Sequence, residues 1–197
     1  MTMERGIDVS ENNGTVDWKA VAAEGISFAI IRLGYGRGYL DSMFYENYNG
    51  ALAAGLKVGV YYYSYALDEA AAEAEARYML EILRDAGIAP EDLAMGCWFD
   101  MEDADGYKAR HGNPGNDVIT EMCFQFILEC NRQGYNCGVY ASLDWLLNRI
   151  DTSVFADYVP IWCAEWGDRC SFDRATLWQD TNELVIGGET FDGDYVL

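Results

Sequence analysis

Positive charge, histidine and proline are scarce in this sequence of 197 residues. It contains 13 Lys and Arg against 33 Asp and Glu, a formal net charge of −20, with one histidine and three prolines. A chain this negative repels phosphate backbones, so nucleic acids are excluded as expected partners. No apolar run approaches the ~20 residues that span a bilayer, so we expect no membrane insertion.

Targeting and linker segments are also missing. The first residues show no basic segment followed by an apolar stretch, so no secretory signal peptide is visible. Without linkers, low-complexity tracts or repeats, residues 1–197 are expected to form one domain. The six cysteines include no C-x-x-C pair, and the rise of about 10.5 Å between Cys123 and Cys130 in a helical segment is too long for a disulfide. We interpret all six as buried thiols and expect no metal or cofactor.

Three common site motifs do not occur. Segment 34–38, GYGRG, follows a strand-like run but matches neither the dinucleotide nor the P-loop pattern. An EF-hand aligned on Gly106 would place Met101 and Gly112 at ligand positions, which excludes a calcium loop of that type. The single histidine, His111, would need a nucleophile, but the sequence contains no nucleophile motif such as G-x-S-x-G. A catalytic triad is therefore not supported.

Strand-like and helix-like segments alternate five times along the chain, and three more strand-like segments follow. The clearest helix, 69–86, has apolar residues three and four apart, with Asp68 as its expected N-cap and Gly87 as its stop. The pattern predicts an α/β fold, an irregular TIM-like (β/α)5(β)3 barrel. The expected strands are 6–9, 28–33, 58–65, 95–101, 138–141, 159–164, 176–179 and 191–196, and the expected helices are 18–24, 44–54, 69–86, 117–133 and 143–147.

Acidic residues lie where the predicted strands end. Asp100 and Glu102 close the fourth strand on one face, with Cα atoms about 6.6 Å apart, whereas Phe99 and Met101 would face the helices. Two carboxyl groups this close do not ionise independently, and the one in the drier environment becomes a general acid near neutral pH. Glycosidases use such a pair.

Two further acids are expected at the mouth of the barrel. Asp8 closes the first predicted strand and Asp192 opens the last, although each by itself is typical of a cap or turn. Aromatic residues gather near the strand ends as well, and their rings suit the C–H faces of sugars, while each single ring also fits core packing. These aromatic residues are Tyr61, Tyr63, Tyr65, Tyr140, Trp162, Trp166 and Trp178.

Seven segments in the same order resemble the catalytic domain of glycoside hydrolase family 25, the Chalaropsis-type lysozymes. The resemblance covers nearly the whole chain. It rests on GIDVS at 6–10, FAIIR at 28–32, GVYYY at 59–63, FDME at 99–102, VYAS at 139–142, PIWCA at 160–164 with WQ at 178–179, and FDGD at 191–194. The implied fold, an irregular barrel of five βα units and three further strands, agrees with the alternation described above.

The resemblance implies roles for individual residues. Glu102 matches the general acid and Asp100 its partner, while Asp8 and Asp192 match two other acidic positions of the site. The implied reaction is hydrolysis of the β-1,4 bond between N-acetylmuramic acid and N-acetylglucosamine in peptidoglycan. Whether Asp100 attacks, activates water or orients a substrate acetamide is left open by the sequence. The implied substrate-binding residues are Arg32, Tyr61, Tyr140, Trp162 and Trp178.

The chain departs from the family pattern on its third strand, which often reads Tyr-His-Phe where Tyr61, Tyr62 and Tyr63 stand, and on its second. Arg32 stands where Lys is more common, and Tyr35 where a Glu often follows, so substrate contacts there are expected to differ. The implied partner is the glycan strand of peptidoglycan, the implied place of action is the cell wall, as an endolysin or an autolysin, and a monomer is expected. A chitinase-like hydrolase and an inactive glycan-binding module remain the alternatives.

Overall fold

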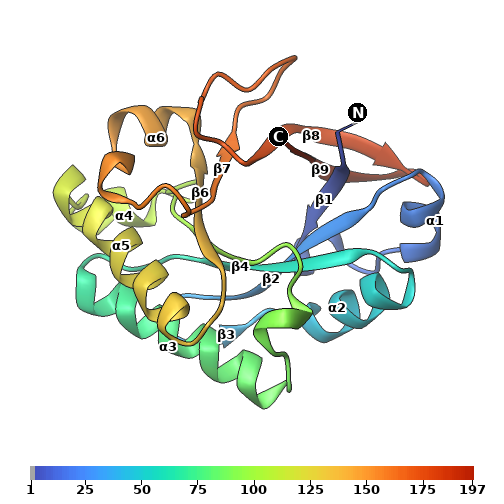
Figure 1. Ribbon diagram of the computed structural model, residues 1–197, viewed down its shortest axis with the longest axis horizontal. Coiled ribbons are helices and arrows are strands. Elements are labelled where there is room, and N and C mark those ends of the chain that lie inside the picture. The colour runs from blue at the N-terminus through green and yellow to red at the C-terminus, as the bar shows by residue number, and fades with distance from the viewer. Residues whose placement is uncertain (1–2) are drawn as a thin grey trace.

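The computed structural model of the protein describes residues 3–197 and shows a closed barrel with helices packed around part of its outside (Figure 1). The first two residues of the N-terminal segment considered for a signal peptide lie outside the described range. The strands are β1 (Arg5–Val9), β2 (Phe28–Tyr35), β3 (Tyr39–Leu40), β4 (Lys57–Tyr63), β5 (Cys97–Asp100), β6 (Cys137–Ser142), β7 (Ile161–Ala164), β8 (Leu177–Ile186) and β9 (Glu189–Val196).

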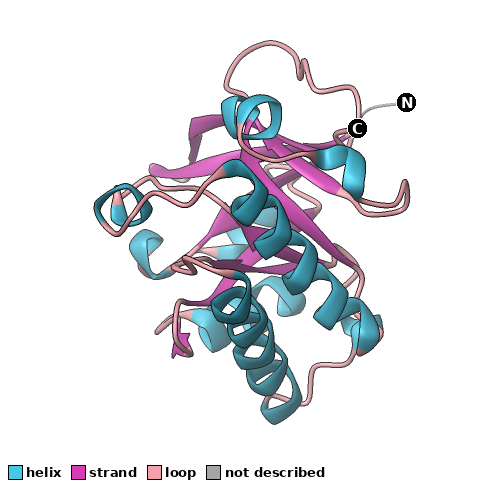
Figure 2. Ribbon diagram, turned by 90° about the vertical axis from the view of Figure 1, so that its left-hand side faces the viewer, coloured by secondary structure: helices cyan, strands magenta, loops and turns pink. Residues whose placement is uncertain are grey.

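The helices follow the strands in the predicted alternation. Figure 2 shows that the long helices flank the strands, and α3 and α5 pack against each other. Among residues 3–197, no helix is both long and apolar enough to cross a bilayer. The α-helices are α1 (Trp18–Ala23), α2 (Phe44–Ala53), α3 (Glu69–Asp85), α4 (Tyr107–Arg110), α5 (Asn116–Arg132) and α6 (Leu143–Asn148), and 3-10 turns cover Glu11–Asn13, Pro90–Asp92 and Thr152–Val154.

Strand order closes the barrel. Seven strands, β1, β2, β4, β5, β6, β7 and β8, are parallel neighbours, and β9 lies antiparallel between β8 and β1. The short β3 pairs with the outer end of β2 and takes no part in the closure. The predicted (β/α)5(β)3 barrel is therefore confirmed, parallel in its first part and antiparallel at its end.

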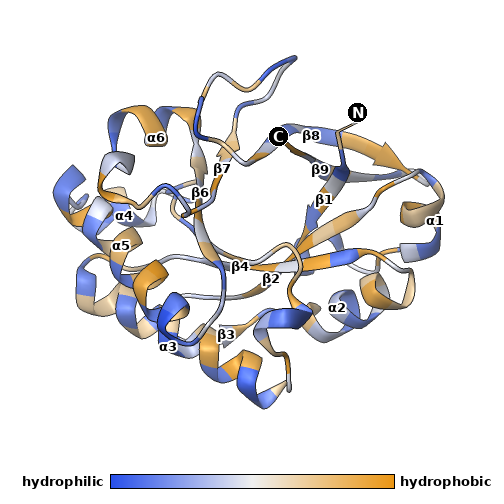
Figure 3. Cartoon of the chain, viewed as in Figure 1, coloured by the Kyte–Doolittle hydropathy of each residue, from blue (hydrophilic) through white to orange (hydrophobic). Residues whose placement is uncertain are grey.

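Two apolar layers stabilise the barrel. The larger layer fills the space between strands and helices and includes Phe99 and Met101, which face the helices as predicted. Helices such as α3 carry both hydrophobic and hydrophilic residues in Figure 3, because only one side of each helix packs on the strands. The smaller layer fills the barrel interior with Phe28, Ile30, Tyr61, Trp98, Trp162 and Leu177.

Most predicted boundaries differ from the observed ones by one or two residues. The predicted N-cap of α3 is confirmed, since the Asp68 carboxylate accepts a 2.8 Å hydrogen bond from the Ala71 N–H. The hairpin of β8 and β9 is longer than predicted. Its strands extend to Ile186 and from Glu189 because Gly187 and Gly188, at φ 61° and 94°, form a two-residue turn. The sequence pattern did not predict this extension because it includes exposed polar residues such as Asn182 and Glu183, which interrupt the apolar pattern of a strand.

The longer hairpin corrects the position of Asp192, which lies inside β9 and not at its start. A second correction concerns β4, which ends at Tyr63, so that Tyr65 lies in the following loop. All six cysteines are free thiols, and five of them are buried as the sequence predicted, whereas Cys170 is only half-buried.

Candidate active site

Four carboxyl groups meet at the mouth of the barrel, where the parallel strands end. Asp8 comes from β1, Asp100 from the end of β5, Glu102 from the loop that follows, and Asp192 from β9. Asp8 and Asp192 are direct partners in the antiparallel pairing of β1 with β9. All four line one cavity of about 390 Å³. The structure thus brings together every acidic residue that the sequence singled out.

Burial raises the pKa of all four carboxyl groups. For Asp8 the largest cause is burial and the next is the negative charge of Asp192, while a hydrogen bond from Gln179 acts in the opposite direction. The pKa of Asp192 is raised by burial. Carboxyl groups crowded in a poorly hydrated site retain protons at higher pH than they would in water.

Asp100 and Glu102 differ in their surroundings. Asp100 is 4% exposed, and burial followed by the charge of Glu102 raises its pKa well above the usual range. Its Oδ1 atom has no hydrogen-bond partner among the described residues. Glu102 is half-buried, and burial is the largest cause of its raised pKa, opposed by the positive charge of Lys108. Asp100 is therefore the drier member of the pair, and Glu102 the one nearer to solvent.

Lys108 was missed by the sequence reasoning. Its side chain is 2% exposed, and its Nζ donates hydrogen bonds to the backbone carbonyl oxygens of Ser64 and Glu102, the latter at 2.8 Å. Its charge lowers the pKa of Asp100 and Glu102. No sequence signal marks this residue, because it lies on the single-turn helix α4 among other polar residues.

Gln179 also lies in the cavity, and sequence reasoning gave it no role of its own. Its Nε2 donates a 2.8 Å hydrogen bond to Asp8 Oδ2, and its Oε1 accepts from the Tyr140 hydroxyl at 3.1 Å. Beneath these groups, the Trp162 Nε1 donates a 2.9 Å hydrogen bond to the fully buried Asp194. Hydrogen bonds therefore join Asp8, Gln179 and Tyr140, and a separate hydrogen bond holds Trp162 to Asp194.

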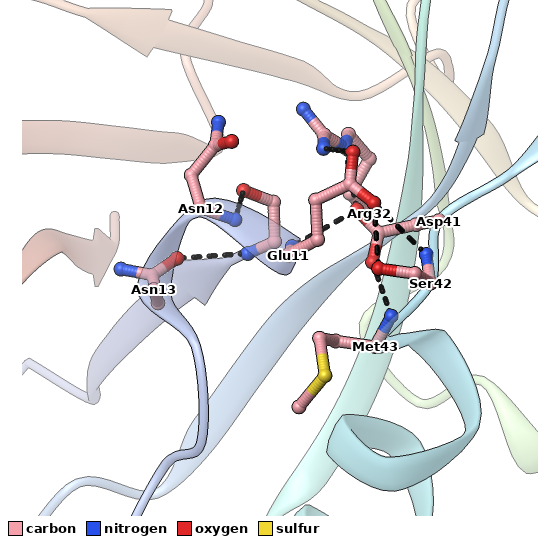
Figure 4. Close-up of polar contacts among 8 residues, drawn as sticks. Glu11, Asn12, Asn13, Arg32, Asp41, Ser42 and Met43 are labelled. Carbon is pink, nitrogen blue, oxygen red and sulfur yellow. Dashed lines mark hydrogen bonds and ion pairs between the residues drawn. The ribbon is translucent and has the colours of Figure 1, made fainter.

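Arg32 lines the cavity, but other protein groups already hold its guanidinium group (Figure 4). Its Nε donates a 2.7 Å hydrogen bond to Asp41 Oδ2 and its Nη2 a 2.9 Å bond to Glu11 Oε1. Glu11 also accepts from the backbone N–H and hydroxyl of Ser42. These contacts fix Arg32 at the edge of the site.

Of the four aromatic residues implied as substrate-binding, Tyr61, Tyr140 and Trp162 line the cavity, and Tyr63 lines it as well. Trp162 packs edge to face on Tyr61 and on Tyr140, with ring centroids 6.3 and 4.5 Å away. The fourth, Trp178, does not line it, and its Nε1 donates to the Glu165 carbonyl. Neighbouring residues on a strand point to opposite faces, so Trp178 faces away from the interior that Leu177 and Gln179 occupy. The geometry gives no support for Trp178 as a substrate-binding residue.

One group of side chains of the types that ligate metals lies outside this cavity. Cys163, Glu165 and Cys170 place one ligand atom each within 4.8 Å of one another, but none of them lines the acidic cavity. The Glu165 carboxylate already accepts hydrogen bonds from the backbone N–H and hydroxyl of Ser171. His111 is exposed and stacks on Tyr107, with ring centroids 4.1 Å apart. The titratable groups that line the acidic cavity are its four carboxyl groups, Arg32 and three tyrosines.

Comparison with known proteins links this site to one family. The model of the family described as glycosyl hydrolases family 25 matches residues 7–189. The autolytic lysozyme of Clostridium acetobutylicum is 28% identical over 83% of this chain and 45% of its own length. Lysozyme M1 of Streptomyces globisporus is 25% identical over 96% of this chain and 66% of its own length. The chain thus spans less than two thirds of the length of either relative.

Solved structures show the same fold. The modular autolysin LytC from Streptococcus pneumoniae superposes with a TM-score of 0.86 at 24% identity, over 99% of this chain and 47% of LytC. The bacterial lysozyme from Streptomyces coelicolor gives a TM-score of 0.79 at 24% identity, over 100% of this chain and 93% of that one.

Proposed function

Since the chain belongs to glycosyl hydrolase family 25 and is a glycoside hydrolase, we propose that it cleaves the β-1,4 bond between N-acetylmuramic acid and N-acetylglucosamine in bacterial peptidoglycan. The observation that carries this proposal is the meeting of Asp8, Asp100, Glu102 and Asp192 in one cavity at the barrel mouth. The names of the relatives, an autolytic lysozyme and lysozyme M1, support the same substrate and an action at the cell wall.

Glu102 is the proposed general acid although Asp100 is the drier of the two carboxyl groups, because Glu102 is the one open to a substrate and stands at the position that matches the family's acid. It lines the cavity, it is half-buried, and its raised pKa keeps it protonated at higher pH than an exposed glutamate. In that state it donates its proton to the glycosidic oxygen as the bond to the leaving sugar breaks. General acid catalysis of this kind contributes about 10²- to 10⁴-fold to the rate.

Asp100 is proposed to orient the N-acetyl group of the sugar whose bond is cleaved. Its unpartnered Oδ1 atom is an acceptor suited to the acetamide N–H. The acetamide oxygen then attacks the anomeric carbon, and water opens the resulting ring with overall retention of configuration. Tyr61, Tyr140 and Trp162 form the proposed aromatic floor under the sugar, and Arg32 its edge.

The experiment is mass spectrometry of borohydride-reduced products from purified peptidoglycan, comparing the wild type with Glu102→Gln. Glu46→Gln, an exposed glutamate on α2, is the matched control. We expect new muramitol ends from the wild type and the control, and about 10²-fold fewer or none from Glu102→Gln. New glucosaminitol ends would mean that the other bond is cleaved, as in a chitinase-like hydrolase, and no cleavage by any protein would indicate a glycan-binding module.

The stereochemistry tests the role of Asp100 separately. Proton NMR of the first product formed should show the β-anomer before mutarotation, because retention preserves the configuration of the cleaved bond. A first product in the α-configuration would contradict acetamide participation and assign Asp100 to the activation of water.

A further inference from the structure

A second cavity, of about 700 Å³, opens beside the acidic site and is walled by tyrosines. Its volume falls within the range typical of small-ligand sites. Its walls come from the turn between β2 and β3, the loop after β4, helix α3 and the region that precedes α4. We call it the tyrosine pocket, and it is lined by Tyr35, Tyr39, Tyr65, Tyr78 and Tyr107.

Segment 34–38 forms one wall of this pocket through Tyr35, Gly36 and Arg37. Gly36 and Gly38 have φ angles of 55° and 81°, and a Cβ atom would lie 3.1 Å from the Tyr65 ring or 3.0 Å from the Tyr78 ring. The buried Tyr62 fixes the turn, since its hydroxyl donates to the Gly36 carbonyl at 2.8 Å and accepts from the Gly38 N–H at 3.1 Å. This segment, which matches no nucleotide motif, serves to bring the tyrosines together.

The tyrosine pocket is joined to the acidic cavity. A third cavity, of about 480 Å³, shares Tyr35 and Tyr65 with the pocket, and shares Arg32 and Tyr63 with the acidic cavity. The rings follow one another along this path: Tyr63 lies 5.1 Å from Tyr65, and Tyr65 6.4 Å from Tyr35. At the far end, Tyr39 stacks on Tyr35 at 5.6 Å. Aromatic faces therefore extend continuously away from the site of cleavage.

The tyrosine pocket is slightly negative, and hydrogen bonds hold one of its rings in place. The Tyr65 hydroxyl donates to Asp105 at 2.8 Å, and its backbone N–H donates to the buried Glu75, also at 2.8 Å, so its ring is held from both ends. The charged side chains that line the pocket are one cation, Arg37, and three acids, Asp68, Glu75 and Asp105. This excess of negative charge disfavours the carboxylate-rich peptide stems of peptidoglycan, and it is compatible with an uncharged ligand.

We propose that the tyrosine pocket is an accessory subsite for an uncharged N-acetylhexosamine unit of the glycan strand, remote from the bond that is cleaved. The proposal rests on the proposed function, which supplies the glycan. Tyrosine rings pack against the C–H faces of a sugar, and their hydroxyl groups bond to its polar substituents. A preformed pocket loses little conformational entropy on binding, so it adds affinity for long strands.

Binding is measured by isothermal titration calorimetry on the Glu102→Gln protein with peptide-free glycan oligosaccharides of four and eight sugars. We expect the octasaccharide to bind more tightly than the tetrasaccharide. Tyr39→Ala should reduce the ratio of the octasaccharide affinity to the tetrasaccharide affinity about 3- to 10-fold, which is the usual contribution of one aromatic contact. Ala71→Trp, which fills the pocket from α3, should do the same. Tyr158→Ala is the control, because Tyr158 is 75% exposed and does not line the pocket.

The subsite proposal would be wrong if both oligosaccharides bound with equal affinity. It would also be wrong if the ratio of the two affinities were unchanged in both pocket variants. A length dependence seen only when the strands carry peptide stems would also overturn it and assign the pocket to the stem. Cleavage by the wild type is scored separately. Its absence would refute the proposed function, whereas the binding ratio would still decide whether the pocket holds glycan.

Discussion

The ammonium group of Lys108 donates a 2.8 Å hydrogen bond to the backbone carbonyl of Glu102, the proposed general acid. The same nitrogen bonds to the Ser64 carbonyl, so one buried side chain joins the loop after β4 to the loop after β5. Lys108 is thus placed both to position the main chain of Glu102 and to moderate the negative charge of the cavity.

Replacing Lys108 by Met should reduce kcat/KM about 10-fold or more, because Glu102 loses its positioning contact. The positive charge lowers the pKa of both Asp100 and Glu102. Its removal should therefore shift both limbs of the pH profile of kcat/KM to higher pH. Lys57→Met, at a half-exposed ion pair with Glu4, is the control and should leave the profile unchanged. A Lys108→Met profile that matches the wild type would show that the residue is merely structural.

Replacing Glu75 by Gln should stabilise the protein at neutral and higher pH. Burial raises the pKa of Glu75 to about 7 from the ordinary 4.5, although hydrogen bonds and Lys108 oppose the shift. A carboxyl group with a raised folded pKa binds protons more tightly in the folded state, so stability is lost as pH rises from about 4.5 to about 7. The variant should gain about 1 to 3 kcal/mol at pH 8 and nothing at pH 4.

Urea unfolding of both proteins at several pH values measures this difference. Glu73→Gln, on the exposed side of the same helix, is the control, since its Glu73–Arg77 pair is half-exposed. A gain for Glu75→Gln that is the same at pH 4 and pH 8 would contradict the titration argument.

Replacing Gln179 by Leu should impair catalysis through Asp8. The variant removes the hydrogen bond that lowers the pKa of Asp8 and leaves the Tyr140 hydroxyl without its acceptor. We expect a loss of about 1 to 3 kcal/mol of stability from these buried polar groups. The acidic limb of the pH profile should move to higher pH, as steady-state assays would show. Gln133→Leu, at the exposed end of α5, should change neither quantity.

The cysteines should titrate as six thiols. Reaction with a thiol reagent should be fast at Cys170, which is half-buried, and slow at the five buried cysteines until guanidinium is added. All six should then react without any reductant. Four reactive thiols in guanidinium would instead indicate one disulfide, and Cys163 with Cys170 would be the pair to examine, because their sulfur atoms lie within 4.8 Å.

The barrel and the acids at its mouth follow from patterns within short stretches of the chain. Alternation of strand and helix is a local pattern, and parallel strands must end at one edge, so Asp8 and Asp100 could be placed there before the fold was known. The spacing of Asp100 and Glu102 fixed their shared face for the same reason.

The groups that surround those acids depend instead on how distant parts of the chain pack together. Asp192 faces Asp8 because β9 inserts antiparallel between β8 and β1, a pairing between residues far apart in the chain. Lys108 becomes a buried cation only where its helix meets the loop after β4. Trp178 turns away from the cavity because strand register sets its face. Burial and charge depend on what packs around a residue in space, and neighbours in sequence do not specify that.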